Sequence, residues 1–394
     1  MAEEWGVVSV DDHLIEPPDT WTSRVPARYL DRCPKVIERD VPPVETSVGF
    51  GPAGQGFAWE FDGRVMPFSG LACSVGHDPE EWRRSIPTFA DLYPGCHDVE
   101  VRLRDMDEAG VLASLNFPTM PGFGGTYLNN NQDRDLSLVC IRAFNDFVFD
   151  EWCAAAPGRF IPGIIVPYWD PALAVAEIER NAARGARAII FTERPHVQGF
   201  PSLYDPARYW DPVFAAAEHH ELVLCCHIGS SSQIDSPPEA DYMTHMAETW
   251  LNAPYSLTEY ALSGTFERFP GLGVVYSEAS IGWMPFVFQT LDRYWNQRAP
   301  YSGTEVRRPP SEYFGRNIFG CFIEDHVGAD QIEQLGVEAI MVEVDYPHAD
   351  TIWPDVRKVI DEQLGHLDAA DQRRVRRGNA ERVFRFQPSP LGTR

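Results

Sequence analysis

The feature that most constrains this sequence is a regular alternation between short apolar runs and segments with helical spacing. Runs rich in β-branched residues cover 7–13, 111–117, 160–167, 186–191, 222–227, 273–278, 317–323 and 339–345. Helical spacing is found at 99–109, 133–156, 171–184, 209–220, 256–266, 281–294 and 330–335. Strands that alternate with helices form a parallel sheet, and eight such units close into a barrel. We therefore predict an α/β fold in which residues 1–394 form a single distorted (β/α)8 TIM barrel.

A long insertion separates the first predicted strand from the first predicted helix. A length of 394 residues also suits two or three domains, but residues 14–99 show no sustained period. This stretch is rich in Gly and Pro and carries scattered aromatic residues: Trp59, Phe61, Phe68, Trp82, Phe89 and Tyr93. We predict a lid with small strands over the end of the first strand, whose aromatic residues favour an apolar substrate. The alternative is a surface elaboration with a small core of its own.

Charge and cysteine content narrow the classes of partner and compartment. The formal net charge is −25, which disfavours nucleic acid and anionic membranes as partners. The N-terminus lacks the pattern of a secretory signal, and no apolar run approaches the roughly 20 residues that span a bilayer. The 8 Cys have no CxxC spacing, so we predict reduced, buried cysteines in a cytoplasmic protein that binds a small molecule.

Polar residues end several of the apolar runs. Asp11 and His13 lie two apart at the end of the first run, so their side chains share one face. His227, Glu278 and Asp345 end the fifth, sixth and eighth runs. Each of these residues alone is more often a helix cap or a hydrogen-bonded end residue. Together they would surround the carboxyl-terminal mouth of one barrel, where oxygen and imidazole donors suit a divalent metal.

The pattern resembles the amidohydrolase superfamily, within it the amidohydrolase-related group that includes aminocarboxymuconate-semialdehyde decarboxylase. The resemblance covers nearly the whole chain and is carried by residues 10–17, 102–111, 224–227, 277–283 and 345–348. It implies a metal at the barrel mouth, with ligands that match Asp11, His13, His227 and Asp345. It also implies a homodimer, and a hetero-oligomer with a related barrel stays open.

Two residues depart from the common pattern of that superfamily. Asp11 and Glu278 each stand where the wider family commonly has a histidine. Asp11, Glu278 and Asp345 would then crowd three carboxylates around one cation, so either one of them stays protonated or a second cation is present. The set suits Mn or Fe about as well as Zn, with one ion or two. Glu193 is a candidate bridging ligand, or else a charge on a surface loop.

The expected chemistry depends on how the metal is used. Our first expectation is a hydrolase, in which metal-bound water attacks an amide, ester or thioester, Asp345 takes the proton and His348 helps. His348 could equally be bonded only to its loop. The alternatives are non-oxidative decarboxylation or hydration, oxygen activation at a dinuclear iron site, and a non-enzymatic subunit. Decarboxylation would need a carboxylate anchor, for which Arg194, Arg64 and Arg293 are candidates.

Overall fold

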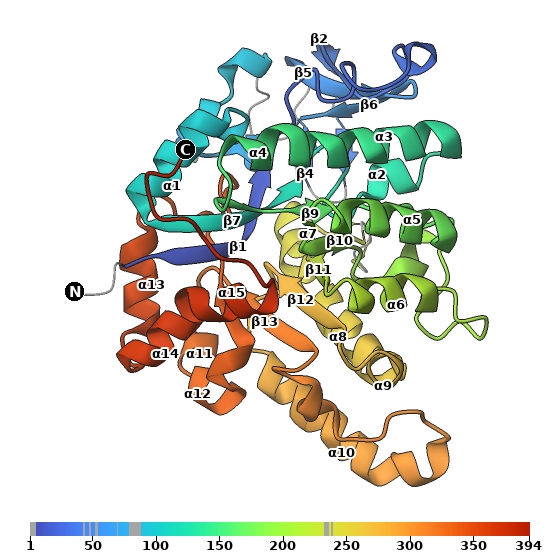
Figure 1. Ribbon diagram of the computed structural model, residues 1–394, viewed down its shortest axis with the longest axis vertical. Helices are drawn as coiled ribbons and strands as arrows, with labels where there is room; N and C mark the ends of the chain where they lie inside the picture. Colours follow the sequence, from blue (N-terminus) through green and yellow to red (C-terminus); the bar gives the residue numbers. More distant parts are fainter. Residues whose placement is uncertain are drawn as a thin grey trace.

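The structure is a computed structural model and describes residues 5–41, 44–46, 49–51, 54–68, 70–78, 88–231, 236–237 and 239–394. The central sheet is parallel and follows the predicted runs (Figure 1). Its strands are β1 (Val7–Leu14), β7 (Val111–Pro118), β8 (Phe160–Ile161), β9 (Gly163–Ile164), β10 (Ala188–Phe191), β11 (Val223–His227), β12 (Gly273–Ser277), β13 (Ile318–Phe322) and β14 (Ile340–Val342). The hydrogen-bonded order is β1-β7-β8 and β9-β10-β11-β12-β13-β14.

The two halves of the sheet join at two irregular places. Pro162 lacks an amide hydrogen and separates β8 from β9, which otherwise act as one strand. On the other side, the segment after β14 runs beside β1. The amide of Asp345 donates to the carbonyl of Asp11 at 2.8 Å, and the amide of His13 donates to the carbonyl of Tyr346 at 2.7 Å. Backbone hydrogen bonds of Asp11, His13 and Asp345, three of the predicted ligands, therefore close the (β/α)8 barrel.

Helices cover the outside of the barrel, most of them where the spacing predicts them. They are α1 (Val99–Ala109), α2 (Thr126–Asn129), α3 (Arg134–Phe147), α4 (Cys153–Ala155), α5 (Pro171–Ala182), α6 (Asp211–His219), α7 (Tyr242–Thr249), α8 (Asn252–Leu262), α9 (Thr265–Arg268), α10 (Met284–Ser302), α11 (His326–Ala329), α12 (Ile332–Leu335), α13 (Val356–Leu364), α14 (Ala369–Arg373) and α15 (Asn379–Val383). Among the described residues, no helix combines the length and apolar character needed to cross a bilayer.

Local signals explain the ends of these helices. The side chain of Asp98 accepts hydrogen bonds from the amides of Glu100 and Val101, which caps the start of α1. Gly110 ends the same helix with φ 76°, a conformation that glycine adopts without steric cost. Helix α7 was not predicted, and α10 begins at Met284 rather than at 281 and continues to Ser302.

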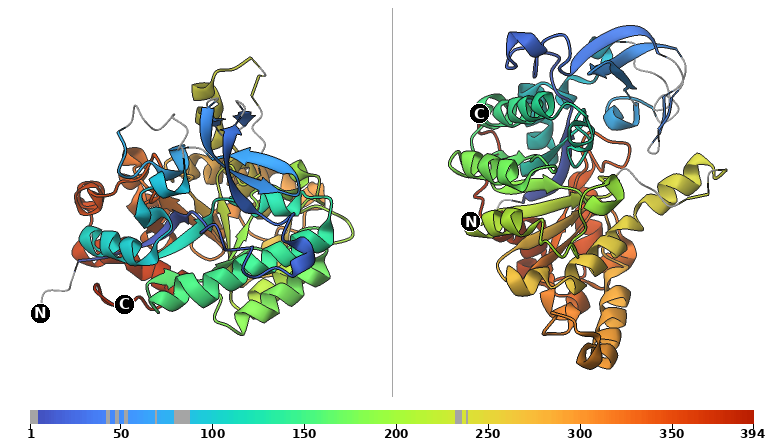
Figure 2. Two further views of the ribbon diagram at one scale, coloured as in Figure 1. Left: turned by 90° about the horizontal axis from the view of Figure 1, so that it is seen from above. Right: turned by 90° about the vertical axis from the view of Figure 1, so that its right-hand side faces the viewer.

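The insertion after β1 forms a small antiparallel sheet beside the barrel. It contains β2 (Lys35–Val41), β5 (Gly54–Phe61) and β6 (Arg64–Pro67), paired in the order β2-β5-β6, and the hairpin β3 (Val44–Thr46) and β4 (Gly49–Gly51). Figure 2 shows this sheet and α7 standing off the same side of the barrel.

The aromatic residues of the insertion are used mainly for packing. Phe68 belongs to a small separate core with Ile15, Phe57, Cys73, Leu92 and Cys96, whereas Trp59 and Phe61 join the main core. Trp82 lies outside the described residues. The aromatic composition of the insertion is therefore accounted for by its folding and gives little information on a substrate.

Two of the cysteines are paired, which corrects the prediction that all of them are reduced. Cys73 and Cys96 form a disulfide within the insertion, 23 residues apart in sequence. The other cysteines are free, and all of them except Cys153 are buried. The spacing of the cysteines in the sequence does not predict this disulfide, because the irregular fold of the insertion brings the two positions together.

Candidate metal centre

Asp11 and His13 on β1 meet His227 from the end of β11. Nε2 of His13 lies 3.3 Å from Oδ1 of Asp11. Nε2 of His227 lies 3.4 Å from Oδ2 of Asp11 and 3.1 Å from Nε2 of His13. All three side chains are fully buried. The structure thus brings together donor atoms that are more than 200 residues apart, as the strand ends predict.

Asp345 and His348, from the loop after β14, complete this cluster. Oδ1 of Asp345 lies 3.3 Å from Nε2 of His13 and 3.1 Å from Nδ1 of His348. Among the residues that the structure describes, three groups of side chains have donor atoms within 4.8 Å of one another: Asp11-His13-His227, His13-Asp345-His348 and Glu278-Asp345-Asp350. His348 therefore faces the cluster and is not merely bonded to its own loop.

The donor set fits a divalent cation because several of its atoms are buried without hydrogen-bond partners. Both carboxylate oxygens of Asp11 and both of Asp345 lack such a partner, as do Nδ1 of His13 and Nε2 of His348. Burying unpaired polar atoms is costly, and a cation bound among the carboxylates would remove much of that cost. Imidazole nitrogens and carboxylate oxygens together suit Mn, Fe or Zn.

Burial also sets the protonation of these groups. It raises the pKa of the Asp11 carboxyl, and the nearby charges of Glu343, Asp345 and Glu278 raise it further. Burial raises the pKa of Asp345 as well. In contrast, burial lowers the pKa of His227 to about 3, so its imidazole is neutral near pH 7. A neutral imidazole and a carboxylate that lacks a compensating charge are both prepared to bind a cation.

Glu278 is held beside the cluster by a strained backbone. It directly follows β12, and its Oε2 lies 3.1 Å from Nε2 of His227. Its amide donates to Oε1 of Glu343 at 2.9 Å. Glu278 and Asp345 have φ of 57° and 56°, which is unusual for residues with a Cβ and is found preferentially at functional positions.

Glu193 is buried, so the alternative of a surface charge is wrong. Its amide donates to Oγ of Ser230 at 3.0 Å, and its Oε1 is buried without a hydrogen-bond partner. Burial raises its pKa to about 8. Glu193 is in none of the three groups of potential ligands found among the described residues.

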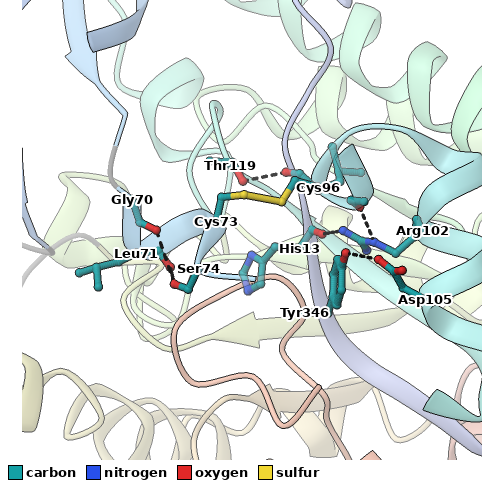
Figure 3. The surroundings of a disulfide bond; sticks show 12 residues. His13, Gly70, Leu71, Cys73, Ser74, Cys96, Arg102, Asp105, Thr119 and Tyr346 are labelled. Atoms are coloured by element: carbon teal, nitrogen blue, oxygen red, sulfur yellow. Dashed lines mark hydrogen bonds between the residues drawn. A yellow bond between two sulfur atoms is a disulfide. The ribbon is translucent and has the colours of Figure 1, made fainter. Parts of the chain in front are cut away.

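A buried arginine and the disulfide-bonded segments contact the two stretches of chain that carry candidate ligands, at the end of β1 and after β14 (Figure 3). Arg102 donates to the carbonyls of His13 at 2.7 Å and Gly95 at 2.8 Å, and it lies 4.2 Å from the ring centroid of Tyr346. The carbonyl of Cys96 accepts from the amide of Ile15 at 2.9 Å, and the amide of Ser74 donates to the carbonyl of Pro347 at 2.9 Å. The bridged segments thus contact both ligand-bearing stretches.

Phe123 forms one wall of the site and was not singled out from the sequence. Its ring centroid lies 4.3 Å from that of His227 and 4.9 Å from that of His13. It belongs to the Gly- and Pro-rich loop after β7 and is half-buried. An aromatic ring in this place gives a substrate an apolar surface next to the donor atoms.

The three arginine residues considered as anchors are either paired with other side chains or exposed. Arg194 donates to Glu259 and Asn252, both at 3.3 Å. Arg64 is exposed and lies over Tyr127, and Arg293 is exposed on α10. Sequence position alone could not place Arg64 and Arg194, because each adjoins a turn or an irregular segment.

Comparison with known proteins agrees with this geometry. The profile of a family described as Amidohydrolase matches residues 25–386. The chain belongs to the amidohydrolase family. This amidohydrolase is 25% identical over 340 residues to the gamma-resorcylate decarboxylase of Polaromonas sp. (strain JS666), a match that covers 80% of the chain and 94% of the relative.

Solved structures of similar proteins extend over the same barrel. The 5-carboxyvanillate decarboxylase of Sphingomonas paucimobilis is 27% identical, with a TM-score of 0.61, and the match covers 74% of this chain and 84% of that one. The dihydroxybenzoic acid decarboxylase of Polaromonas sp. JS666, solved with manganese and the inhibitor 2-nitroresorcinol, is 17% identical, with a TM-score of 0.64 and coverage of 96% and 97%.

These relatives correct our first expectation about the reaction. The prediction of an enzyme is confirmed, but the prediction of acyl hydrolysis is wrong, because the curated relative and the two solved structures named above are decarboxylases. The decarboxylase alternative agrees better with them. The ligand residues could not distinguish the two, since the same cation can serve both reactions.

Proposed function

We propose that this protein is a metal-dependent decarboxylase that removes carbon dioxide from a carboxylated aromatic ring without oxidation. The observation that carries the proposal is the half-buried ring of Phe123 beside a buried set of unpaired carboxylates and neutral imidazoles. Such a site can hold an aromatic ring against a cation. The decarboxylases among its relatives support the same substrate class.

The cation would be held by Asp11, His13, His227 and Asp345. Manganese is the metal in the related dihydroxybenzoic acid decarboxylase structure, and the oxygen-rich donor set here suits it. When bound, the cation supplies positive charge that attracts and polarises the oxygen atoms of the substrate.

The chain itself would supply the proton that replaces the lost carboxylate. The bond between the ring carbon and the carboxylate breaks, carbon dioxide leaves, and the electron pair remains on the ring carbon, which then takes one proton. Asp345 is placed to deliver this proton from its carboxyl group, and His348, whose Nδ1 lies 3.1 Å from Oδ1 of Asp345, is placed to relay a new proton from water that restores the carboxyl group. No external oxidant or reductant is needed.

Release of carbon dioxide tests this proposal. Manganese-loaded protein is incubated under argon in D₂O with 13C-carboxyl-labelled 2,6-dihydroxybenzoate, 5-carboxyvanillate and further hydroxybenzoates. We expect equal amounts of labelled carbon dioxide and phenol for at least one of them, with deuterium at the former carboxyl position. Fully loaded protein that releases no carbon dioxide from any of these acids would overturn the proposal.

Three further predictions accompany this proposal. We propose that the insertion at residues 14–99 acts as a lid, supported by its contacts with the loop that carries Asp345 and His348. The homodimer, with a hetero-oligomer of related barrels as its alternative, is inferred from the resemblance. The cytoplasmic location is inferred from the sequence alone.

A further inference from the structure

Two buried polar side chains, Glu193 and Ser231, lie together at the mouth of the barrel. Glu193 follows β10 and Ser231 belongs to the loop after β11, so both come from the carboxyl ends of neighbouring strands. Both are completely buried, and the amide of Ser231 donates to Oε2 of Glu193 at 3.5 Å. Among the described residues, neither belongs to a group of potential metal ligands, so their role lies elsewhere.

Each of these side chains has an atom that is free to bond a ligand. Within the part of the chain that the structure describes, Oε1 of Glu193 and Oγ of Ser231 are buried without a hydrogen-bond partner. Burying polar atoms unpaired costs free energy, and a ligand that bonds to both of them would recover it.

The backbone around the pair is fixed by its own hydrogen bonds. The amide of Glu193 donates to Oγ of Ser230 at 3.0 Å, and the carbonyl of Glu193 accepts from Oγ of Ser256 at 2.7 Å. The carbonyl of Ser230 accepts from Oγ1 of Thr126 at 2.8 Å. The two free atoms are therefore held in position before a ligand binds, which lowers the entropy cost of binding it.

The pair adjoins the segment that carries Phe123. A Cβ added to Gly124 would lie 3.3 Å from Cα of Thr192 and 3.3 Å from Cβ of Ser230, the two residues that directly precede the pair. The ring of Phe123 lies 4.3 Å from that of His227, centroid to centroid. An aromatic ligand held against Phe123 would thus adjoin both the metal centre and the pair.

The chemistry of the pair matches a hydroxyl group. Burial raises the pKa of Glu193 to about 8, so its carboxyl group is largely protonated near pH 7. It then offers one O–H donor and one carbonyl acceptor, and the hydroxyl group of Ser231 can donate or accept. A phenolic hydroxyl group also donates and accepts, so it can bond to both side chains at once.

We propose that Glu193 and Ser231 form a subsite that binds a ring hydroxyl group of a hydroxylated aromatic acid lying against Phe123. The subsite selects the substrate and takes no part in breaking its bonds. The inference rests on the proposed function for the substrate class, but it concerns recognition, so binding tests it apart from turnover.

Binding of two nitrophenols to the manganese-loaded protein is the experiment. 2-Nitroresorcinol carries one hydroxyl group more than 2-nitrophenol, and calorimetry at one pH gives the ratio of their dissociation constants for each variant. We expect the wild type to prefer 2-nitroresorcinol, and this preference to fall about 10-fold in Ser231→Ala and in Glu193→Met, which each remove one partner of the hydroxyl group. Glu193→Gln keeps a donor and an acceptor and should retain most of the preference. Differences in acidity between the probes cancel, because only ratios are compared between proteins.

Ser137→Ala is the matched control. Its Oγ is also buried without a hydrogen-bond partner among the described residues, but it lies on α3, outside the barrel. This variant should keep the wild-type ratio. Equal affinity of the wild type for both probes, or an unchanged ratio in either Ser231→Ala or Glu193→Met, overturns the inference alone. A wild type that binds neither probe overturns it together with the proposed substrate class, and melting curves establish that each variant is folded.

Discussion

The imidazole rings of His13 and His348 stack face to face, with ring centroids 3.6 Å apart and planes inclined by 23°. One ring belongs to β1 and the other to the loop after β14, so the stack joins the first and last strands of the barrel at the metal centre. Nδ1 of His348 also lies 3.1 Å from Oδ1 of Asp345. His348 therefore combines a packing role with a position for proton transfer, and substitution can separate the two.

His348→Phe should preserve the stack while removing both nitrogens. If His348 relays a proton to Asp345, kcat should fall about 100-fold or more with little change in bound metal. His348→Ala should lose the stack as well and bind the metal more weakly. Steady-state kinetics with parallel metal analysis measure both effects. A kcat for His348→Phe close to the wild-type value would show that His348 contributes through packing and does not transfer a proton.

His227→Ala and Asp345→Asn should separate metal binding from turnover. His227→Ala removes a neutral nitrogen donor and should weaken metal binding at least about 100-fold, with loss of activity. Asp345→Asn keeps one oxygen donor, so part of the metal should remain while kcat falls about 1000-fold. Metal content after dialysis against a weak chelator measures the first effect. Normal metal content in His227→Ala would remove this residue from the site.

The disulfide should stabilise the protein against unfolding. Closing a loop between residues 23 apart contributes about 3 kcal/mol, chiefly through the unfolded chain. The double variant Cys73→Ser/Cys96→Ser should lose about this free energy of unfolding in urea, and reductant should have no further effect on it. Cys153→Ser, which removes an unpaired thiol, should respond to reductant as the wild type does. If reductant left the free energy of unfolding of the wild type unchanged, this would argue against the Cys73–Cys96 disulfide.

The metal-free protein should become less stable as the pH rises from 6.5 to 8. Burial raises the pKa of Glu16 to about 7 and of Glu193 to about 8. A raised folded-state pKa contributes stability at low pH that is lost as the pH rises through it, at up to about 1.4 kcal/mol per pH unit for each group. The pKa of His227 is lowered to about 3, so its contribution is lost only below its unfolded value of 6.5.

Melting temperatures in the presence of a chelator measure this dependence. Glu193→Gln keeps an amide oxygen as acceptor but cannot ionise, so its melting temperature should fall less between pH 6.5 and pH 8. A flat profile for the wild type, or equal slopes for the two proteins, would show that Glu193 does not titrate in this range.

The barrel and the grouping of its candidate ligands were predictable because they depend on local pattern. Apolar runs that end in a polar residue mark strand ends, and all strand ends of one parallel barrel meet at the same mouth. The sequence could therefore group four candidate ligands without any knowledge of how the loops fold: Asp11, His13, His227 and Asp345. Glu278 was placed with them for the same reason, and it lies beside His227.

Features that depend on irregular segments were not predictable. The ring of Phe123, the bonds of Arg102 to the ligand strand and the Cys73–Cys96 bridge all arise from how loops fold onto the barrel. Asp350 lies beyond the last strand in a loop without periodicity. The reaction was misjudged because donor atoms specify a cation, whereas the rest of the pocket and the substrate decide what that cation does.

The most direct test of the account is the anomalous scattering of crystals of the manganese-loaded protein, collected on both sides of the manganese absorption edge. We expect a manganese peak at the barrel mouth within coordination distance of Asp11, His13, His227 and Asp345. A manganese peak bound elsewhere, or none at this mouth in protein shown to contain the metal, would contradict it.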